Sequence, residues 1–268
     1  MKIFFYIFLF LLQQHCDAAQ RELVIVSENY APASFIEAGQ ITGFDVDIAK
    51  AVFDRLGVRY TIKLVPVARA LNMLNNGQAD VGLHFSYSSE RAAYLDWPKT
   101  AVWDADFVFM TTKANKARYP LKNLEDVTRT GLSVGIIQNN IYHPDFWKAF
   151  PSPHRENMEF NHQLDPASDA ATNLKKLAAG RIQLFPFPLI LSRYMTRVMQ
   201  LDTITTYDWV IFSKPYPNTF SKNSTWSSPA YHDIHALMQA YNTELIRLKS
   251  DPAKFNQFFQ HYDAEIKN

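Results

Sequence analysis

Gly43-Phe44-Asp45-Val46-Asp47-Ile48-Ala49-Lys50-Ala51 is the stretch from which the fold of this 268-residue chain is most directly predicted. Asp45 is expected to cap a helix that ends at Gly57, where a left-handed residue commonly stands. The apolar face of this helix consists of Ile48, Ala49, Val52, Phe53 and Leu56. The largely apolar runs Leu23–Ser27 before the helix and Tyr60–Val67 after it predict strands. This order of elements predicts a parallel β-α-β unit.

The alternation of strand and helix continues along the chain and then starts again. Helix Ala68–Asn76 and strand Asp80–Phe85 complete a first unit. A second unit is predicted from strands Leu132–Gln138, Met158–His162 and Ile182–Phe185 and from helices Pro144–Phe150 and Ala167–Ala179. Strands Ala105–Thr112 and Trp209–Ser213 flank the second unit, and helices near Tyr231–Lys249 and Pro252–Tyr262 follow it. The pattern predicts an α/β protein.

The simplest arrangement of these elements inserts the second unit into the first. Lobe one is then formed by residues 20–112 together with 208–268, and lobe two by residues 113–207. The chain crosses between the lobes twice, which makes a two-segment hinge suited to closure around a ligand. Two consecutive domains are the alternative, but that arrangement leaves the C-terminal helices without a sheet of their own.

The first 19 residues have the pattern of a secretory signal peptide. Lys2 is followed by the unbroken apolar run Ile3–Leu12, and Ala18 and Ala19 supply the small residues of a cleavage site. The run is too short for a transmembrane helix, which needs about 20 apolar residues. The one cysteine, Cys16, lies in this segment, so we expect a mature protein without disulfides in the periplasm.

Composition and motifs argue against several classes of function. The formal net charge is +1, which gives no overall field for nucleic acid or anionic membranes. The sequence has no glycine-rich phosphate loop, no G-x-S-x-G and no C-x-x-C. His232 and His235 have a spacing that can bind a metal, but no third ligand is evident nearby. We therefore predict a monomeric binding protein with no cofactor, no metal and no enzymatic activity.

Several short motifs occur in an order typical of one protein family. After Gly43–Ala51 come Gly77-Gln78-Ala79-Asp80, Ser86-Tyr87-Ser88-Ser89-Glu90-Arg91, Leu95-Asp96-Trp97 and the segment Leu121–Val127. From about residue 21 to 262, their order and spacing resemble the bacterial extracellular solute-binding proteins of family 3, the polar-amino-acid type that serves ABC transporters. The resemblance implies a periplasmic binding protein-like II fold, in which two α/β lobes joined by a hinge bury a ligand between them.

Arg91 is the leading candidate for ligand contact. The resemblance implies that the arginine of this E-R motif grips the ligand's carboxylate, and a planar guanidinium offers two parallel donors for that purpose. Ser86 and Ser88 precede it at the end of a strand, where hydroxyls and free amides can bind an anion. Ser88 is equally suited to be only a helix N-cap. A surface arginine that bridges Glu90 or Asp96 is the alternative for Arg91.

Aromatic residues and a second arginine extend the candidate site. The resemblance implies an aromatic ring against the ligand after the first strand, where Tyr30 and Phe35 stand, although Phe35 also suits the core. Three more rings suit either the cleft wall or the core: Phe85, Tyr87 and Trp103. Arg69 starts a helix, where a cation opposes the helix dipole. It therefore either binds a second anionic group of the ligand or is a solvated surface residue.

Lobe two departs from the amino-acid-binding pattern that the resemblance implies. The loop after the strand Leu132–Gln138 contains Asn139 and Asn140, which take the place of the family's usual small and hydroxyl-bearing residues. We expect both asparagines to contact the ligand. Phe187, in a later strand-like stretch, belongs to the same candidate set.

An expected acid is also missing from lobe two. The resemblance implies a carboxylate near Pro188 that would pair with the ammonium of an amino acid. Burying an ammonium without such a partner is costly. The ligand is therefore predicted to be a carboxylate or other anion rather than a standard amino acid held in the usual way, unless Asp104 or Asp106 supplies a substitute.

Together these features predict an extracytoplasmic solute-binding protein that captures a small, carboxylate-bearing ligand for the permease of an ABC-type importer. Two alternatives share the fold. A sensory protein would present its closed form to a membrane receptor. A cyclohexadienyl or arogenate dehydratase-like enzyme would need a general acid in the cleft, and the missing acid near Pro188 counts against it.

Overall fold

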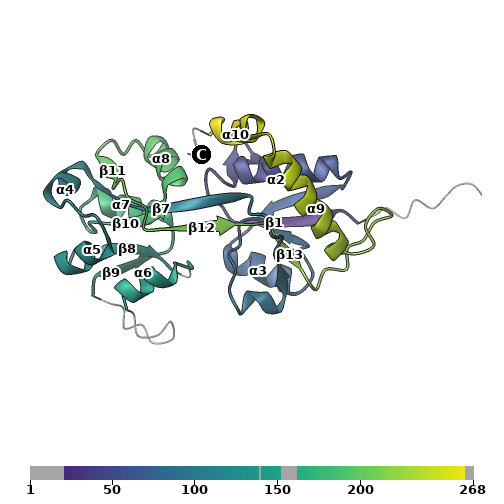
Figure 1. The fold of residues 1–268 in the computed structure, drawn as a ribbon, viewed down its shortest axis with the longest axis horizontal. Coiled ribbons are helices and arrows are strands. Elements are labelled where there is room, and N and C mark those ends of the chain that lie inside the picture. The colour runs from purple at the N-terminus through teal and green to yellow at the C-terminus, as the bar shows by residue number, and fades with distance from the viewer. Residues whose placement is uncertain (1–20, 139, 152–161, 263–268) are drawn as a thin grey trace, which may run out of the picture.

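The computed structural model describes residues 21–138, 140–151 and 162–262. They form two lobes joined by two strands (Figure 1). The predicted signal peptide lies outside the described residues. In the part of the chain that is described, no helix combines the length and the apolar character needed to cross a membrane.

Lobe one is built around a five-stranded sheet. Its strands, in spatial order, are β4 (Tyr60–Leu64), β1 (Leu23–Ser27), β5 (Val81–Gly82), β13 (Thr219–Ser221) and β6 (Leu95–Asp96). β1 is parallel to β4 and β5, as the predicted β-α-β units require, whereas β13 is antiparallel to β5 and β6. A hairpin of β2 (Phe35–Glu37) and β3 (Gln40–Thr42) and the short helix η1 (Arg91–Ala93) complete its irregular parts.

Helices cover both sides of this sheet (Figure 1). They are α2 (Phe44–Arg55), α3 (Val67–Asn75), α9 (Ile234–Lys249) and α10 (Pro252–Gln260). α2, α9 and α10 pack on one another, while α3 packs on β1, β5 and β13 away from them. The C-terminal helices therefore pack onto α2 of lobe one.

The N-terminus of α2 differs from the prediction, because Gly43 and not Asp45 is its N-cap. Gly43 has φ 127° and ψ 155°, a conformation that residues with a Cβ rarely adopt. No side chain caps the helix. The amides of Phe44 and Asp45 donate instead to the carbonyls of Pro32 and Ala33, at 3.0 and 3.1 Å. The Asp45 side chain is thereby released from capping and is buried in the interior.

Replacing Gly43 by alanine should lower the free energy of unfolding by about 1–3 kcal/mol through the backbone conformation alone. A steric clash adds to this loss, because a Cβ would lie 2.3 Å from the Ala33 oxygen. Urea denaturation measures the change. Gly39→Ala is the matched control, since Gly39 also has a positive φ, of 79°, but nothing within 4 Å of its Cβ position. Equal losses in the two variants would contradict a contribution from the clash.

Lobe two has a sheet of β10 (Phe185–Pro188), β7 (Trp103–Thr112) and β11 (Ile204–Thr206). The parallel pair β8 (Val134–Ile137) and β9 (Leu164–Ala167) joins it through a bridge between Val134 and Leu184. The helices of this lobe are α4 (Lys113–Arg118), α5 (Leu124–Thr130), α6 (Pro144–Ala149), α7 (Ala170–Ala178) and α8 (Leu189–Val198).

Of two strands predicted for lobe two, the first falls outside the described residues except for His162, and the second lies at other residues in the structure. Residues 158–161 of the first fall outside the described residues, His162 is in a turn, and the strand that pairs with β8 is β9. The second, predicted at Ile182–Phe185, is displaced to β10. Pro186 and Pro188 conceal this strand from pattern analysis, because proline is rare within a sheet.

β7 and β12 (Phe212–Tyr216) connect the two lobes (Figure 1). They form an antiparallel ladder that runs from Trp103 opposite Tyr216 to Phe107 opposite Phe212. Over Phe107–Thr112, β7 also pairs with β10 and β11 of lobe two. The chain therefore passes between the lobes twice. The predicted division of the lobes at residues 112 and 208 stays a prediction. The pairing favours a first boundary before Phe107 in β7 and a second boundary after residue 208, near β12.

Candidate functional site

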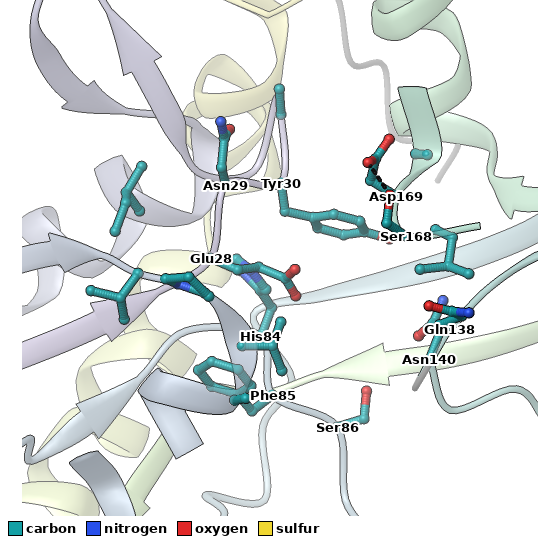
Figure 2. A pocket seen from close by; sticks show the side chains of 18 of the residues that line it. Glu28, Asn29, Tyr30, His84, Phe85, Ser86, Gln138, Asn140, Ser168 and Asp169 are labelled. Atoms are coloured by element: carbon teal, nitrogen blue, oxygen red, sulfur yellow. Dashed lines mark hydrogen bonds between the residues drawn. The ribbon is translucent and has the colours of Figure 1, made fainter. Parts of the chain in front are cut away.

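A cleft of about 1100 Å³ lies between the lobes. Its polar lining from lobe one consists of Glu28, Asn29, Tyr30, His84, Ser86 and Arg91. Its polar lining from lobe two consists of Gln138, Asn140, Ser168 and Asp169, and Tyr216 contributes from β12. In Figure 2, Glu28 and Tyr30 extend from lobe one toward these lobe-two residues.

The lobe-one wall is formed where two parallel strands end. Glu28 and Tyr30 follow β1, while His84 and Ser86 follow β5, and β1 and β5 are neighbours in the sheet. The carboxyl ends of parallel strands meet at one edge of a sheet, which is where ligands bind in open α/β folds. The chain order alone therefore brings these side chains together.

Arg91 is half-buried and lines the cleft. Its Nη1 donates to the carbonyl of Ser86 at 3.0 Å, and its backbone amide donates to Oγ of Ser88 at 3.2 Å. Burial lowers the pKa of the guanidinium, although Tyr94, Glu90 and Glu28 oppose this. Within the described residues, its side-chain hydrogen bond goes to a carbonyl and not to a carboxylate. The guanidinium therefore retains donors for a ligand anion.

A carboxylate and an ammonium lie near Arg91. Burial raises the pKa of Glu28, while the charges of His84, Arg91 and Lys214 act in the opposite direction. Lys214, in β12, donates from Nζ to the carbonyl of Ile141 at 2.8 Å, and Nζ lies 4.9 Å from the centre of the Tyr216 ring. Burial lowers the pKa of Lys214 to about 7, with the charge of Arg91 adding to the effect and Glu28 opposing it.

The depressed pKa of Lys214 predicts a pH dependence of stability. Between pH about 7 and about 10, the unfolded chain keeps a lysine proton that the folded protein has largely released, so stability rises with pH. Lys214→Met should remove this contribution. Urea denaturation of both proteins at pH 7 and pH 9 should therefore show a smaller gain in the variant. An equal gain in the two proteins would contradict the prediction.

Aromatic rings line the cleft, and two of them, Tyr30 and Phe187, meet across it. Tyr216 is buried and stacks on Trp103 with ring centres 4.4 Å apart, and Trp103 meets Phe44 edge-on at 5.2 Å. Tyr30 from lobe one meets Phe187 from lobe two at 6.2 Å, also edge-on. Burial raises the pKa of both Tyr30 and Tyr216, so these phenols stay neutral hydrogen-bonding groups.

Lobe two contributes polar groups to the opposite wall. Asp169 is the N-cap of α7 and accepts hydrogen bonds from the Thr172 amide and the Ser168 hydroxyl, both at 2.7 Å. Burial opposes ionisation, but these hydrogen bonds prevail and lower the pKa of Asp169. Gln138 and Asn140 project from the loop after β8 (Figure 2).

Six of the residues selected from the sequence line the cleft: Tyr30, Phe85, Ser86, Arg91, Asn140 and Phe187. Asn139 lies outside the described residues. The other five do not line it: Phe35, Arg69, Tyr87, Ser88 and Trp103. Hydrophobic packing explains two of these, because Phe35 contacts the rings of Tyr194 and Tyr262 and Trp103 lies beneath Tyr216.

The remaining three lie at the surface or beside the cleft. Arg69 is exposed on α3, and the Tyr87 side chain is 65% exposed with its ring against Trp97. Ser88 accepts from the Arg91 amide, but the N-cap of η1 is Glu90 and not Ser88. Sequence spacing had placed these residues near the site without indicating on which side of the backbone they lie.

The carboxylates of the cleft are not the ones considered from the sequence. Asp104 and Asp106 are exposed on β7, whereas Glu28 and Asp169 line the cleft. Both could have been found. Glu28 directly follows the first predicted strand, and Asp169 stands before an apolar helix, where an N-cap is expected. His84, also missed, follows the strand that leads to Arg91.

Metal binding finds no support in this region. Among the described residues, no group of three or more histidine, cysteine and acidic side chains is placed to hold a metal ion. His232 and His235, considered for their spacing, are both exposed at the beginning of α9.

Comparison with known proteins identifies a family that matches this chain. The family described as bacterial extracellular solute-binding proteins, family 3, matches residues 23–262. No curated protein sequence matches the chain. The family match spans both lobes and both hinge strands.

Solved structures share the fold at low sequence identity. The sensor domain of a histidine kinase with similarity to periplasmic binding proteins is 18% identical, with a TM-score of 0.70 over 91% of this chain and 97% of that one. The arginine-, lysine-, histidine-binding protein ArtJ of Geobacillus stearothermophilus is 17% identical, with a TM-score of 0.70 over 92% and 97%. The ancestral amino acid-binding protein AncCDT-1, a precursor of cyclohexadienyl dehydratase, is 19% identical, with a TM-score of 0.67 over 90% and 95%.

Proposed function

The chain belongs to the bacterial extracellular solute-binding proteins of family 3, and on this premise we propose that it captures a small carboxylate-bearing solute between its lobes. The solute is held outside the cytoplasm and delivered to the permease of an ABC-type importer. The protein binds the solute without transforming it. Ligand contact with both lobes only in the closed state supplies the free energy of closure.

The observation that carries this proposal is the position of Arg91. Its guanidinium lies in the cleft, half-buried, with donors not committed to any carboxylate of the described residues. A carboxylate can accept two parallel hydrogen bonds from such a group. The charge pair also gains strength where the closed lobes exclude water. Ser86, at the end of β5, adds a hydroxyl beside it.

The other groups of the cleft support a solute with a second polar end. Glu28 extends into the cleft from β1, and Asp169 lies across from it on lobe two (Figure 2). The position near Pro188, where the family pattern implies an acid, is the buried end of β10. A cationic or hydrogen-bond-donating group of the solute would therefore be held by Glu28 rather than from that position. Tyr30, Phe85 and Phe187 provide apolar surface for the body of the solute.

A thermal-shift screen tests the proposal most directly. The panel would contain amino acids, amino-group-free carboxylates, dicarboxylates, short peptides and aromatic acids, each at millimolar concentration. A solute at about 100 times its Kd stabilises a protein by about 2.7 kcal/mol, which raises the Tm by several degrees. Arg91→Ala should bind at least about 30-fold more weakly and should therefore reduce the shift to about a third or less. An undiminished shift in this variant, or a full panel without any shift, would contradict the proposal.

A second candidate function is favoured by Glu28. A dehydratase of the cyclohexadienyl type needs a general acid in the cleft, and burial raises the pKa of Glu28, which suits an acid that donates a proton. The similarity of the fold to AncCDT-1 is compatible with this. A turnover assay with prephenate, run beside Glu28→Gln, separates enzyme from binding protein. Glu28-dependent turnover would replace the binding proposal with the enzymatic one.

Transport and sensing differ in the partner that meets the closed form. The sensor domain of the histidine kinase shows that the fold also serves in sensors. We favour transport, because the family that matches residues 23–262 is described as extracellular solute-binding proteins. A pulldown with the solute bound, using detergent-solubilised membranes, distinguishes an ABC permease from a receptor.

A further inference from the structure

A chain of four buried polar side chains lies behind the lobe-one wall of the cleft. His84 Nδ1 lies 2.9 Å from Oδ2 of Asp45, and His84 Nε2 lies 3.3 Å from Oγ of Ser27. Ser27 Oγ lies 2.9 Å from Oγ of Ser34, which donates to the Glu28 carbonyl at 2.6 Å. All four side chains are buried, and only His84 among them lines the cleft.

The direction of each hydrogen bond in this series of side chains follows from its last acceptor, the Glu28 carbonyl. A carbonyl only accepts, so the single proton of the Ser34 hydroxyl is committed to Glu28. Ser34 must then accept from Ser27, which commits the single Ser27 proton. The contact between Ser27 and His84 therefore needs a proton on Nε2 of the imidazole.

The opposite nitrogen needs a proton as well. His84 Nδ1 and Asp45 Oδ2 lie at 2.9 Å, so one of them is protonated. A free imidazole is more basic than a free carboxylate, which places the shared proton on Nδ1. His84 then carries two ring protons, and the Asp45 carboxylate is its counterion. Both side chains are almost fully buried, at 1% and 0% exposure.

This arrangement is costly in three ways, which argues that it does more than fill space. Burying an ion pair is often no more stabilising than burying apolar side chains of the same size. Asp45 Oδ1 in addition has no hydrogen-bond partner within the described residues. His84 also has φ 47°, in the left-handed region that residues with a Cβ rarely adopt. Such outliers concentrate at functional sites.

Besides Asp45, three aromatic rings and the Glu28 carboxylate lie near His84. The ring of Tyr30 lies 5.5 Å from it, that of Phe85 6.2 Å and that of Tyr216 6.5 Å. A cation is attracted to an aromatic ring within about 6 Å, a range that the Tyr30 ring meets. Tyr30 in turn meets Phe187 of lobe two, so His84 supports a ring that reaches across the cleft. The charge of His84 is also the largest of the three charges that lower the pKa of Glu28.

We propose that His84 is a buried imidazolium, fixed by Asp45 and Ser27, that positions Tyr30 and sets the charge of the lobe-one wall. Both N–H groups are committed, so His84 does not hydrogen-bond the solute. It acts as a positioning residue, through the Tyr30 ring and through Glu28. Its effect on solute choice rests on the proposed function and favours solutes whose cationic or hydrogen-bond-donating end reaches an ionised Glu28.

The protonation of His84 can be tested without any solute. Protein labelled with ¹⁵N-histidine is observed at pH 7 by two-dimensional NMR, and the His84 signals are assigned by their contacts to Tyr30. We expect both ring nitrogens of His84 to carry hydrogen. Asp45→Asn should leave one nitrogen bare, whereas Asp47→Asn should leave both protonated. Asp47 is the matched control, because it lies in the same helix turn and pairs with Tyr262 instead. A bare nitrogen in the unaltered protein would overturn the proposal.

The role in solute choice is tested with the strongest solute of the screen. His84→Gln keeps a hydrogen-bond donor for Asp45 and removes the charge. It should weaken binding about tenfold, because the Tyr30 ring and Glu28 lose a neighbouring cation, and residues that act without touching a ligand change its affinity by amounts of this order. Asp47→Asn should bind as the unaltered protein does. Equal affinities of His84→Gln and Asp47→Asn would overturn the positioning role. A screen without any hit would instead disprove the proposed function, and the NMR result would still decide the charge of His84.

Discussion

Arg91→Ala should weaken binding of the cognate solute by at least about 30-fold. Truncating one partner of a buried, hydrogen-bonded charge pair costs about 2–5 kcal/mol, largely because the solute's carboxylate is left without a countercharge. The guanidinium is well placed for this effect, since Arg91 lines the cleft, Nη1 donates to the Ser86 carbonyl and the backbone amide donates to Oγ of Ser88. Isothermal titration calorimetry measures the change in Kd.

Arg69→Ala provides the comparison for this prediction. Arg69 belongs to the same lobe and carries the same charge, but it is exposed on α3 and does not line the cleft. We expect the affinity of Arg69→Ala for the solute to stay within about threefold of that of the unaltered protein, because exposed charges contribute little. Equal losses in the two variants would show that overall charge, and not the position of Arg91, attracts the solute.

Trp103→Ala should lower the free energy of unfolding by about 3–5 kcal/mol, the usual range for truncating a buried tryptophan. Trp103 is 1% exposed and lies between the rings of Phe44 and Tyr216. It also begins β7, so the cavity would open where lobe one meets the hinge. Urea denaturation followed by circular dichroism gives the loss.

Tyr87→Ala is the control for Trp103, because it removes a large ring that is 65% exposed. Its cost should stay within about 0.5 kcal/mol. Both residues were selected from the sequence as possible walls of the cleft. Similar losses in the two variants would mean that the Trp103 ring is not part of the packed core.

Local sequence patterns were sufficient to predict most of the fold. The two-lobed, periplasmic binding protein-like class is confirmed by the family match and by the solved structures. The helices α2, α3, α9 and α10 lie within a few residues of their predicted positions, because their apolar faces recur every three or four residues. β10 was misplaced and α8 was not predicted, since prolines interrupt the pattern on either side of Phe187.

The site was harder to predict than the fold, for a physical reason. Motif spacing places a residue along the chain but not the direction of its side chain. Phe85 faces the cleft while Tyr87, two residues later, faces solvent, and the irregular backbone between β5 and η1 follows no simple alternation. His84 could not be recognised, because its partners Asp45 and Ser27 are close only in the folded protein.

The position of β13 in the lobe-one sheet has a consequence for the order in which the protein assembles. β13 lies between β5 and β6, although more than a hundred residues separate it from both in the chain. A chain that is synthesised from its N-terminus cannot complete this sheet until residue 221 is available. The strands β7 to β11, which include the whole sheet of lobe two apart from its pairing with β12, all end before residue 207. Lobe two can therefore become compact while the edges of β5 and β6 are still unpaired, because β13, which fills the gap between them, is synthesised later.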